Sequence, residues 1–220
     1  FTTSSIGINY STSSPFSSGK SLQLTGGGSY NGSAWSSPSQ VQVQYDDAFK
    51  LYNNNFTIEF WFYATSGGTA IASWGGSNSS FYITVKDRTA SFVAKLATTT
   101  SNADSGTLST NPQFTLSTGA NVYNSAAWNH FALVRSSNNF EIFINGTSQA
   151  SGDIANANYG KYIVSPSSGT DAITIGCIDK INSYTSNTTW FNGYLDDITF
   201  INGTVKYSSS FTPSGPIGGT

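Results

Sequence analysis

Charged side chains are scarce in this chain: Asp, Glu, Lys and Arg make up 9% of 220 residues, and the net charge is −2. Lys and Arg form no cluster, and nucleic-acid binding needs a cationic surface, so we expect no nucleic-acid partner. No apolar run approaches the roughly 18 residues of a membrane span, so we expect no membrane insertion. The single cysteine, Cys177, excludes an internal disulfide, and its apolar neighbours predict a buried strand residue.

Methionine is also absent, and no signal peptide is visible, so we expect the chain to be processed or excised from something longer. Aromatic residues, by contrast, reach 15%. Disordered chains usually combine many charges with few aromatics, so this composition favours a folded protein. The length is enough for one large domain with a real core.

Short strand patterns separated by Gly-, Asn- and Ser-rich turns dominate the sequence, and no helical periodicity lasts beyond one turn at 46–52. This pattern predicts an all-β sandwich or barrel. The clearest strand, 56–64, alternates strictly. Its two faces carry Phe56, Ile58, Phe60 and Phe62 on one side, and Thr57, Glu59, Trp61 and Tyr63 on the other. Further strands are predicted at 22–24, 41–45, 69–74, 81–85, 90–96, 113–117, 130–135, 140–144, 172–178 and 194–201.

The stretch WNHFALVRSSNNFEIFING at 128–146 predicts a β-meander, with one turn at 136–139 and a second at Asn145-Gly146. Long loops are expected at 25–40, 98–112 and 178–190, and 146–170 also has little strand character. Such loops in a compact domain are usually functional or mobile. We expect one domain over residues 1–207, followed by a Ser/Pro/Gly-rich tail or linker at 208–220.

These motifs, in this order, resemble the laminin-G-like domains of the concanavalin A-like superfamily over roughly residues 15–213. The resemblance lies in GKSLQLTGGGSY, FTIEFWFYA, WNHFALVR with FEIFINGT, AITIGC and FNGYLDDITF. It implies a jelly-roll of two antiparallel sheets that binds glycans or proteins through rim loops or a sheet face. Some relatives also hold calcium at the rim. The final run, with Asp196-Asp197-Ile198, Lys206-Tyr207 and Phe211-Thr212-Pro213, is similar to the version in phage tail-associated proteins.

Catalytic patterns are missing. The one histidine, His130, has no nucleophile-elbow motif to serve, and in the resembled family it is structural. Glycosidases need two carboxylates roughly 5 to 9.5 Å apart. The two glutamates, Glu59 and Glu141, lie on different strands, and the adjacent Asp196 and Asp197 should point to opposite faces. We expect no enzyme. Asp196 should share an apolar face with Tyr194, Ile198 and Phe200 and tie down a loop, with a metal role as the alternative.

Calcium needs six to eight oxygen ligands. The loop aspartates are scattered singly, and isolated loop aspartates most often cap turns. Asp153 and Asp179 are the leading candidates for a Ca²⁺ site, because each follows a strand or hairpin at a predicted rim.

Sugar rings present apolar faces that stack on aromatic side chains, while amides bind their hydroxyls. Aromatic and Asn residues in the loops therefore form the predicted ligand-binding set, although each aromatic alone could simply pin its loop. The outward Trp61 and Tyr63 form a sheet-face alternative. The set comprises Tyr30, Trp35, Tyr159, Tyr184, Trp190, Asn158 and Asn182.

The sequence thus predicts a non-catalytic carbohydrate-binding module of a phage tail fibre or surface adhesin. Its partner would be a host cell-surface glycan, bound through rim loops. The location would be a virion or extracellular surface, within a larger multimeric assembly that compensates for modest affinity per site. The alternative from a different class is a structural or decoration domain that mediates protein–protein contacts.

Overall fold

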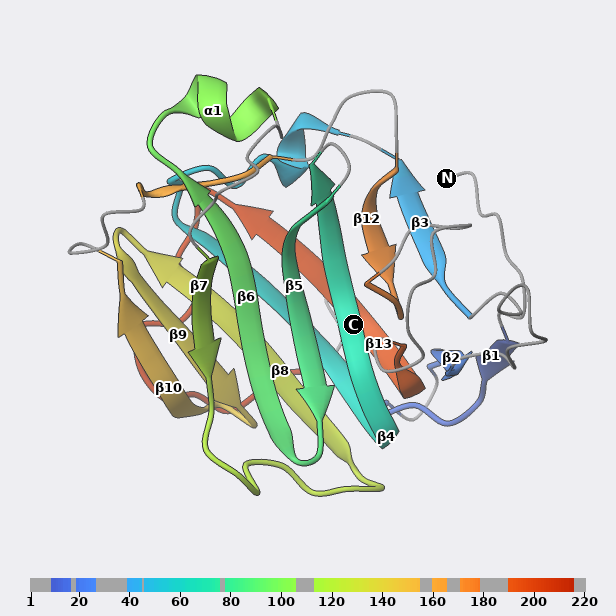
Figure 1. The fold of residues 1–220 in the computed structure, drawn as a ribbon. Helices are drawn as coiled ribbons and strands as arrows, with labels where there is room; N and C mark the ends of the chain where they lie inside the picture. The colour runs from blue at the N-terminus through green and yellow to red at the C-terminus, as the bar shows by residue number, and fades with distance from the viewer. Residues whose placement is uncertain are drawn as a thin grey trace.

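The computed structural model describes residues 9–16, 19–26, 39–44, 46–75, 78–105, 113–154, 160–165, 171–178 and 190–215. They form an all-β, antiparallel sandwich of two layers, the jelly-roll expected from the sequence (Figure 1). Its strands are β1 (Asn9–Ser11), β2 (Ser21–Thr25), β3 (Val41–Gln44), β4 (Phe56–Gly75), β5 (Asn78–Lys86), β6 (Thr89–Ala97), β7 (Gln113–Ser117), β8 (Trp128–Ser136), β9 (Asn139–Ile144), β10 (Thr147–Asp153), β11 (Tyr162–Ile163), β12 (Asp171–Ile175) and β13 (Asn192–Asn202). Two short helices, η1 (Asp47–Phe49) and α1 (Thr100–Ser105), lie between strands.

The strand β4 belongs to both layers. Residues 56–63 of β4 pair with β8, whereas residues 67–75 pair with β5. The back layer in Figure 1 therefore runs β1-β2-β13-β4-β8-β9-β10. The front layer runs β3-β12-β4-β5-β6-β7. The expectation of two separate strands at 56–64 and 69–74 was wrong, because one strand crosses from layer to layer.

Glycine makes this crossing possible. Gly67 and Gly68 have φ values of 70° and 145°, a region that other residues rarely adopt. A Cβ atom on Gly68 would also lie 2.0 Å from the carbonyl oxygen of Trp190. The Gly-Gly pair, which reads as a turn in the sequence, therefore bends a continuous strand instead of ending it.

The core lies between the layers and is rich in phenylalanine and isoleucine. Phe56, Ile58, Phe60 and Phe62 are fully buried, which confirms the predicted inward face of β4. Within the back layer Phe60 stacks on Phe131 at 4.8 Å between ring centroids. Phe92 of the front layer stacks on Phe140 of the back layer at 5.5 Å, so the rings bridge the sandwich. Burying each such side chain contributes about 1.5–3 kcal/mol.

The predicted meander at 128–146 is confirmed as the strands β8, β9 and β10. Asn145 and Gly146 form the two-residue turn between β9 and β10, and their φ values of 51° and 76° are those of a type I′ hairpin. Asn145 also accepts a hydrogen bond from the backbone N–H of His130 at 2.8 Å. Its side-chain N–H donates to the amide oxygen of Asn129 at 3.0 Å. The turn is thus tied to the start of β8.

Four other local expectations have clear outcomes. The helical turn predicted at 46–52 is confirmed as η1, and Cys177 is fully buried as predicted. The loop expected at 98–112 contains the helix α1. The segment 146–170, in which little strand was expected, contains β10 and β11. Its β10 residues, TSQASGD, lack the apolar alternation that marks a strand, so pairing with β9 decides their structure.

A bulge in β13 corrects the predicted faces of the YLDDITF segment. Asp196 pairs with Trp61, but the next paired residue, Thr199, faces Glu59, so β13 contains one extra residue here. Asp197 occupies the inserted position with φ of 48°. Tyr194 and Asp196 therefore lie on the outer face. Ile198 and Phe200 pack on the core, so the expectation that all four share a face was wrong.

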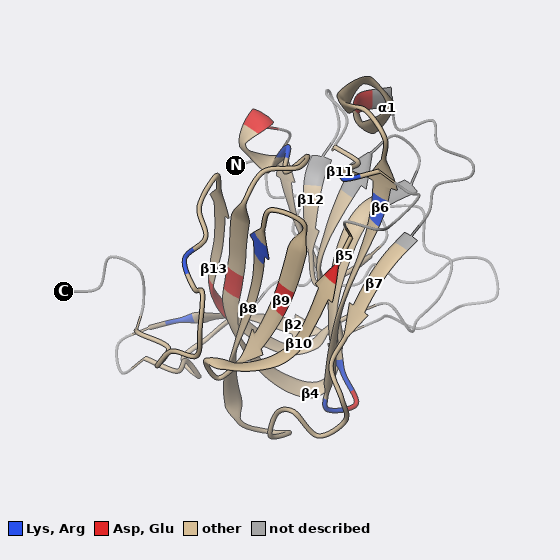
Figure 2. Ribbon diagram, turned by 90° about the vertical axis from the view of Figure 1, so that its left-hand side faces the viewer, with Lys and Arg blue, Asp and Glu red and all other residues tan. Residues whose placement is uncertain are grey.

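After β13 the chain crosses the outer face of the back layer, on the left in Figure 2. We call residues 203–213 the strap. Val205, Tyr207 and Phe211 of the strap pack on Ala132, Val134 and Phe143. The N–H of Phe211 donates to the carbonyl of Gly146 at 2.9 Å. Part of the predicted tail thus lies against the sandwich, and the domain boundary at 207 stays a prediction.

None of the helices found among the described residues has the length and apolar character needed to cross a membrane.

Candidate functional site on the outer face of the back layer

The loop residues predicted to bind ligand fall mostly outside the described residues. Of the set, only Trp190 is placed; it is 3% exposed and bridges to Thr69 and Cys177. Its indole lies in the interior in this structure. The residues outside the described ranges are Tyr30, Trp35, Asn158, Tyr159, Asn182 and Tyr184. The rim-loop site therefore stays a prediction.

Of the two candidate calcium ligands, the structure describes only one. Asp153 is exposed at the end of β10, and Asp179 lies outside the described residues. Across the residues that the structure describes, no group of three or more His, Cys, Asp or Glu side chains is arranged to hold a metal ion. The calcium site therefore stays a prediction.

The outer face of the back layer carries a group of ionisable, hydrogen-bonding and aromatic side chains, and Glu59 lies among them. Glu59 is 3% exposed, and its carboxylate forms an ion pair with the Lys206 ammonium of the strap. The hydroxyl of Tyr207 donates to Oε2 of Glu59 at 2.7 Å. The hydroxyl oxygen of Thr57, two residues earlier on β4, accepts a hydrogen bond from the backbone N–H of Lys206 at 3.0 Å. The Lys206-Tyr207 pair of the resembled motif thus anchors the strap on β4.

These contacts also shift the pKa values of the anchoring groups. Burial lowers the pKa of Lys206, but the hydrogen bonds with Glu59 and Tyr207 outweigh it, so the net direction is upward. Burial, together with Glu59, raises the pKa of Tyr207. Both groups therefore keep their protons at neutral pH, and Glu59 is held as a paired structural carboxylate.

His130 lies beside Glu59, with Nε2 at 3.7 Å from Oε2 of Glu59. Trp61 and Phe211 present ring edges to its imidazole at 5.2 and 5.8 Å between centroids. Burial lowers the pKa of His130 to about 4, although Glu59 opposes the shift. His130 is therefore neutral at pH 7. Its Nδ1 atom is buried without a hydrogen-bond partner in the described chain, so no described group orients the imidazole as a general base would require.

Three half-buried aromatic rings meet at one end of this face. Tyr63, Trp128 and Tyr194 come from the neighbouring strands β4, β8 and β13. The Tyr63 ring lies 6.0 Å from Trp128 and 5.6 Å from Tyr194, and Trp128 is 6.3 Å from Tyr194. Gln23 of β2 donates its amide N–H to the Tyr194 hydroxyl at 3.4 Å. We call these three residues the aromatic cluster.

The aromatic cluster contains one half of the predicted sheet-face alternative. Tyr63 belongs to it, whereas Trp61 packs between the rings of Phe16 and His130, at 5.7 Å from Phe16. Sequence reasoning missed Trp128 and Tyr194 as members. Their outward position follows from pairing directly with Tyr63, which the sequence of a single strand cannot reveal.

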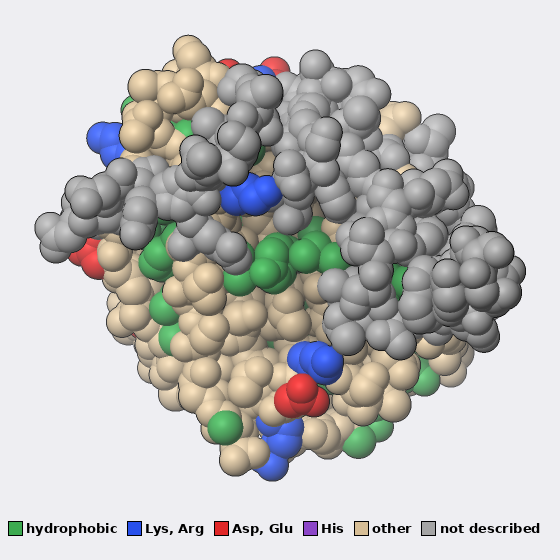
Figure 3. Space-filling model, viewed as in Figure 1, with side chains coloured by type: hydrophobic (Ala, Val, Ile, Leu, Met, Phe, Trp, Pro, Cys, Tyr) green, Lys and Arg blue, Asp and Glu red, His purple; other side chains and the backbone are tan. Residues whose placement is uncertain are grey.

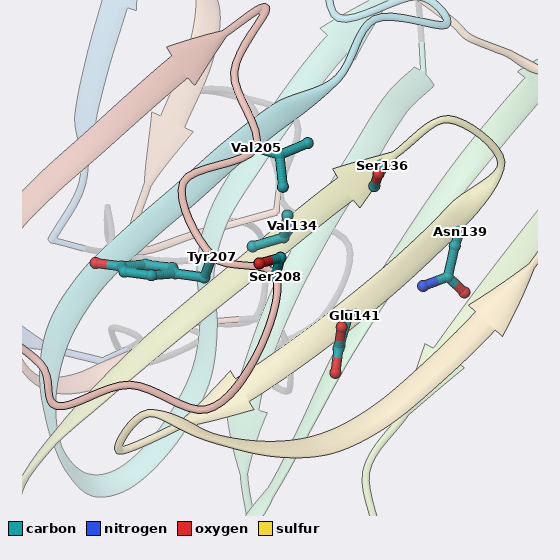
Figure 4. A pocket seen from close by; sticks show the side chains of 7 residues that line it. All are labelled: Val134, Ser136, Asn139, Glu141, Val205, Tyr207 and Ser208. Atoms are coloured by element: carbon teal, nitrogen blue, oxygen red, sulfur yellow. The ribbon is translucent and has the colours of Figure 1, made fainter.

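A pocket of about 230 Å³ lies at another part of the face, between the strap and the hairpin of β8 and β9. Figure 4 shows that β8, β9 and the strap each contribute side chains. The apolar contributions come from Val134, Val205 and Tyr207, and the polar ones from Ser136, Asn139, Glu141 and Ser208. Sequence reasoning did not find this pocket, because the path of the strap over the β8–β9 hairpin depends on contacts between segments that are far apart in sequence.

Asp196 holds the N-terminal segment. It accepts a hydrogen bond from the Ser14 hydroxyl at 2.8 Å through one carboxylate oxygen. The other oxygen accepts from the N–H of Asp197 at 2.9 Å. This is the tethering role expected from the sequence, on the opposite face from the one predicted.

Arg135 is a structural residue that sequence reasoning missed. It is fully buried and donates to the carbonyl oxygens of Tyr52 at 2.6 Å, Lys161 at 2.8 Å and Ser137 at 2.9 Å. Burial lowers its pKa to about 10, so it remains charged at neutral pH. The sequence signal was a cationic residue at a core-facing position of HFALVR. The Arg135 guanidinium holds three chain segments together.

On the outer face of the front layer, the described side chains include Tyr82, Val93 and Lys95. Tyr82 of β5 pairs with Val93 of β6, and Lys95 follows two residues later on the same face. Partial burial lowers the pKa of Lys95. Hydrophobic side chains gather near the centre of this face (Figure 3). Charged side chains are few and scattered in the part of the chain drawn in colour in Figure 2.

The chain belongs to the family described as the concanavalin A-like lectin/glucanases superfamily, in its laminin-G form, which matches residues 36–208. This confirms the resemblance at the level of the superfamily. No curated protein matches the sequence.

Solved structures share the fold at low sequence identity. The binding domain of Paraclostridial Mosquitocidal Protein 1 has a TM-score of 0.62 at 14% identity, over 92% of this chain and 44% of that one. Domain 4 of AbnA, an arabinanase from Geobacillus stearothermophilus in complex with arabinotriose, scores 0.55 at 15% identity over 91% and 78%. The binding domain of Botulinum Neurotoxin DC in complex with SialylT scores 0.53 at 15% over 91% and 42%. The chain thus spans less than half of either toxin domain.

Proposed function

We propose that this chain is a non-catalytic carbohydrate-binding module. The observation that carries the proposal is the aromatic cluster, in which Tyr63, Trp128 and Tyr194 are half-buried on an outward sheet face of a lectin-type fold. Partly exposed rings stack on the C–H faces of sugars, while the tyrosine hydroxyls and the Gln23 amide bind sugar hydroxyls. Two of the structurally similar domains were solved with saccharides, which supports this class of ligand.

We propose a non-catalytic role although the same superfamily includes glucanases. Glu59 is buried and paired with Lys206, and His130 is neutral and packed between rings. Glycoside hydrolysis needs one carboxylate to act as acid and another as nucleophile or base. With Glu59 engaged by the strap, Glu141 is the one glutamate left, and no aspartate lines the pocket beside it.

Rim-loop recognition remains part of the proposal, and the aromatic cluster would extend or replace it. The proposed setting is a phage tail fibre or surface adhesin that displays several copies toward a host glycan. Modest affinity at each site would then add up through multivalency. The support for a phage setting is the C-terminal motif, whose Lys206, Tyr207 and Phe211 form the strap. A virion or extracellular location belongs to the same proposal.

A glycan array probed with a multimerised form of the chain tests the proposal. We expect binding to a subset of saccharides. Trp128→Ala and Tyr194→Ala should each lower the affinity at least tenfold, because stacking of the sugar on the aromatic rings supplies most of the contact. Tyr10→Ala is the matched control, because Tyr10 is 77% exposed on β1, away from the cluster. Absence of binding to every host-type saccharide would contradict the lectin proposal.

Calcium is a separate proposal, which rests on Asp153 and Asp179 and on loops outside the described residues. Repeating the array with a chelator, and melting the protein with and without millimolar calcium, tests it. Specific binding to the folded state raises the melting temperature. An unchanged melting temperature and an unchanged array would remove calcium from the proposal.

A structural or decoration module is the second candidate function. The observation in its favour is the group of hydrophobic side chains at the centre of the front face (Figure 3). Apolar surface of this kind can mark a protein–protein contact. Analytical ultracentrifugation would support this alternative if substitution of the half-buried Tyr82, Tyr82→Asp, abolished self-association while glycan binding was absent.

A further inference from the structure

The pocket between the strap and the β8–β9 hairpin has a lining with two chemical characters. Val134, Val205 and Tyr207 supply apolar surface, while Ser136, Asn139, Glu141 and Ser208 supply hydrogen-bonding groups. A pyranose ring has the same division, with C–H groups on its faces and hydroxyls at its edge. A volume of about 230 Å³ is below the roughly 300–1,000 Å³ of pockets that hold drug-sized ligands, so it suits one sugar residue.

The polar groups of the pocket are not used by the fold. None of the four side chains forms a hydrogen bond or ion pair with any residue that the structure describes. The contrast with Glu59 is direct, because Glu59 on the same face has a cation and a hydroxyl as partners. Polar side chains that have no partner in the described fold and converge on one cavity are available to a ligand.

Glu141 is the one charged residue that lines the pocket. On this face the Lys206 ammonium pairs with Glu59, and the Arg135 guanidinium is buried in the interior, where it donates to three carbonyl oxygens. The pocket therefore has an uncompensated negative charge. A charge-assisted hydrogen bond from an ammonium group would be stronger than one from a hydroxyl, and an anionic ligand would be repelled.

We propose that this pocket binds a single terminal amino sugar, with its ring on Val134, Val205 and Tyr207 and its protonated amine on Glu141. The Asn139 amide and the Ser136 and Ser208 hydroxyls would bind the ring hydroxyls. A lysine side chain shares the ammonium group, but it would leave these three polar groups without partners, so the sugar fits the lining better. The inference rests on the proposed carbohydrate-binding function and names a ligand class for a second site.

Isothermal titration and saturation-transfer NMR of the 220-residue chain at pH 6 test this proposal with four probes. These are methyl glucosaminide, methyl N-acetylglucosaminide, methyl glucuronide and lysine amide. We expect millimolar binding of the glucosaminide, at least fivefold weaker binding of its N-acetylated form, and none of the glucuronide. Glu141→Gln should abolish the preference between the first two probes, and Asn139→Ala should weaken both without changing their ratio.

Several results would overturn the proposal. Equal binding of lysine amide would make the pocket an ammonium site and not a sugar site. Equal binding of the glucuronide, no binding of the glucosaminide, or an unchanged preference in Glu141→Gln would each remove it. Circular dichroism of the variants and the Tyr10→Ala control exclude misfolding as the cause. If the array still shows binding that depends on Trp128, the proposed function stands while the pocket fails.

Discussion

Glu59 and Glu141 are the only two glutamates in the chain, and both point outward from the back layer. The strap treats them differently. Lys206 and Tyr207 of the strap contact Glu59 and bury it. A pocket separates the strap from Glu141, whose carboxylate has no partner among the described residues. The comparison shows that the covering segment, and not the strand that carries a residue, decides whether a carboxylate is structural or available.

Lys206→Met should produce the largest effect, because it leaves the Glu59 carboxylate buried with one hydroxyl as its partner. We expect a loss of about 3 kcal/mol in the free energy of unfolding, at the lower end for broken buried ion pairs because Lys206 is partly exposed. Urea denaturation measures the loss. Lys20→Met is the matched control, since Lys20 is exposed, and it should change stability by less than about 0.5 kcal/mol. Equal losses in both variants would refute the role of the ion pair.

Acidification should loosen the same centre through His130. Its folded-state pKa of about 4 is below the ordinary 6.5, so the unfolded chain binds the proton first as the pH falls. Stability from this group is complete above pH 6.5 and is lost on descent toward pH 4, by about 2–3 kcal/mol. Melting curves of the protein and of His130→Phe between pH 7 and 4 should diverge across that window. Parallel curves would show that His130 does not contribute.

Phe211→Ala should release the middle of the strap with a smaller loss. The ring stacks on Tyr207 at 3.5 Å between centroids and packs on Phe143 at 5.5 Å, and it is only partly buried. We expect a loss of about 2 kcal/mol, below the usual range for a fully buried phenylalanine. Hydrogen exchange should show faster exchange at the Phe211 amide, which donates to Gly146. Unchanged exchange there would show that the ring does not hold the strap.

Glu141→Gln should have the smallest effect on stability, within about 0.5 kcal/mol, because no described contact of the fold depends on its charge. Urea denaturation alongside Glu59→Gln sharpens the comparison, since the same substitution at Glu59 removes an ion pair. A large loss in Glu141→Gln would place this carboxylate among the structural residues.

The alternation of apolar residues made much of this fold predictable. The inward face of β4, the meander of β8 to β10 and the Asn145-Gly146 turn follow from two-residue periodicity and from turn chemistry, which are local properties. Three features were not local. Continuity of β4 through Gly67 and Gly68, the bulge at Asp197, and strand formation in β10 all depend on the neighbouring strand that supplies the hydrogen bonds.

The candidate site was predictable only in part. Tyr63 was recognised as outward-facing, but its association with Trp128 and Tyr194 required the register of three strands. The Lys-Tyr and Phe-Thr-Pro motif was visible as a resemblance, while its physical role as a strap on Glu59 was not. Motif residues that are far apart in sequence acquire a common role only when folding brings them together.

The sequence by itself determined the all-β class, the family and the poverty of charge, because strand periodicity, motif order and composition are carried by the residues themselves. Tertiary structure decided which outward residues are covered and which are accessible. The side-chain period places Glu59 and Glu141 on an outer face, but only the path of residues 203–213 over that face neutralises one and leaves the other beside a pocket. That path results from contacts between segments about 60 to 150 residues apart, which no local pattern encodes.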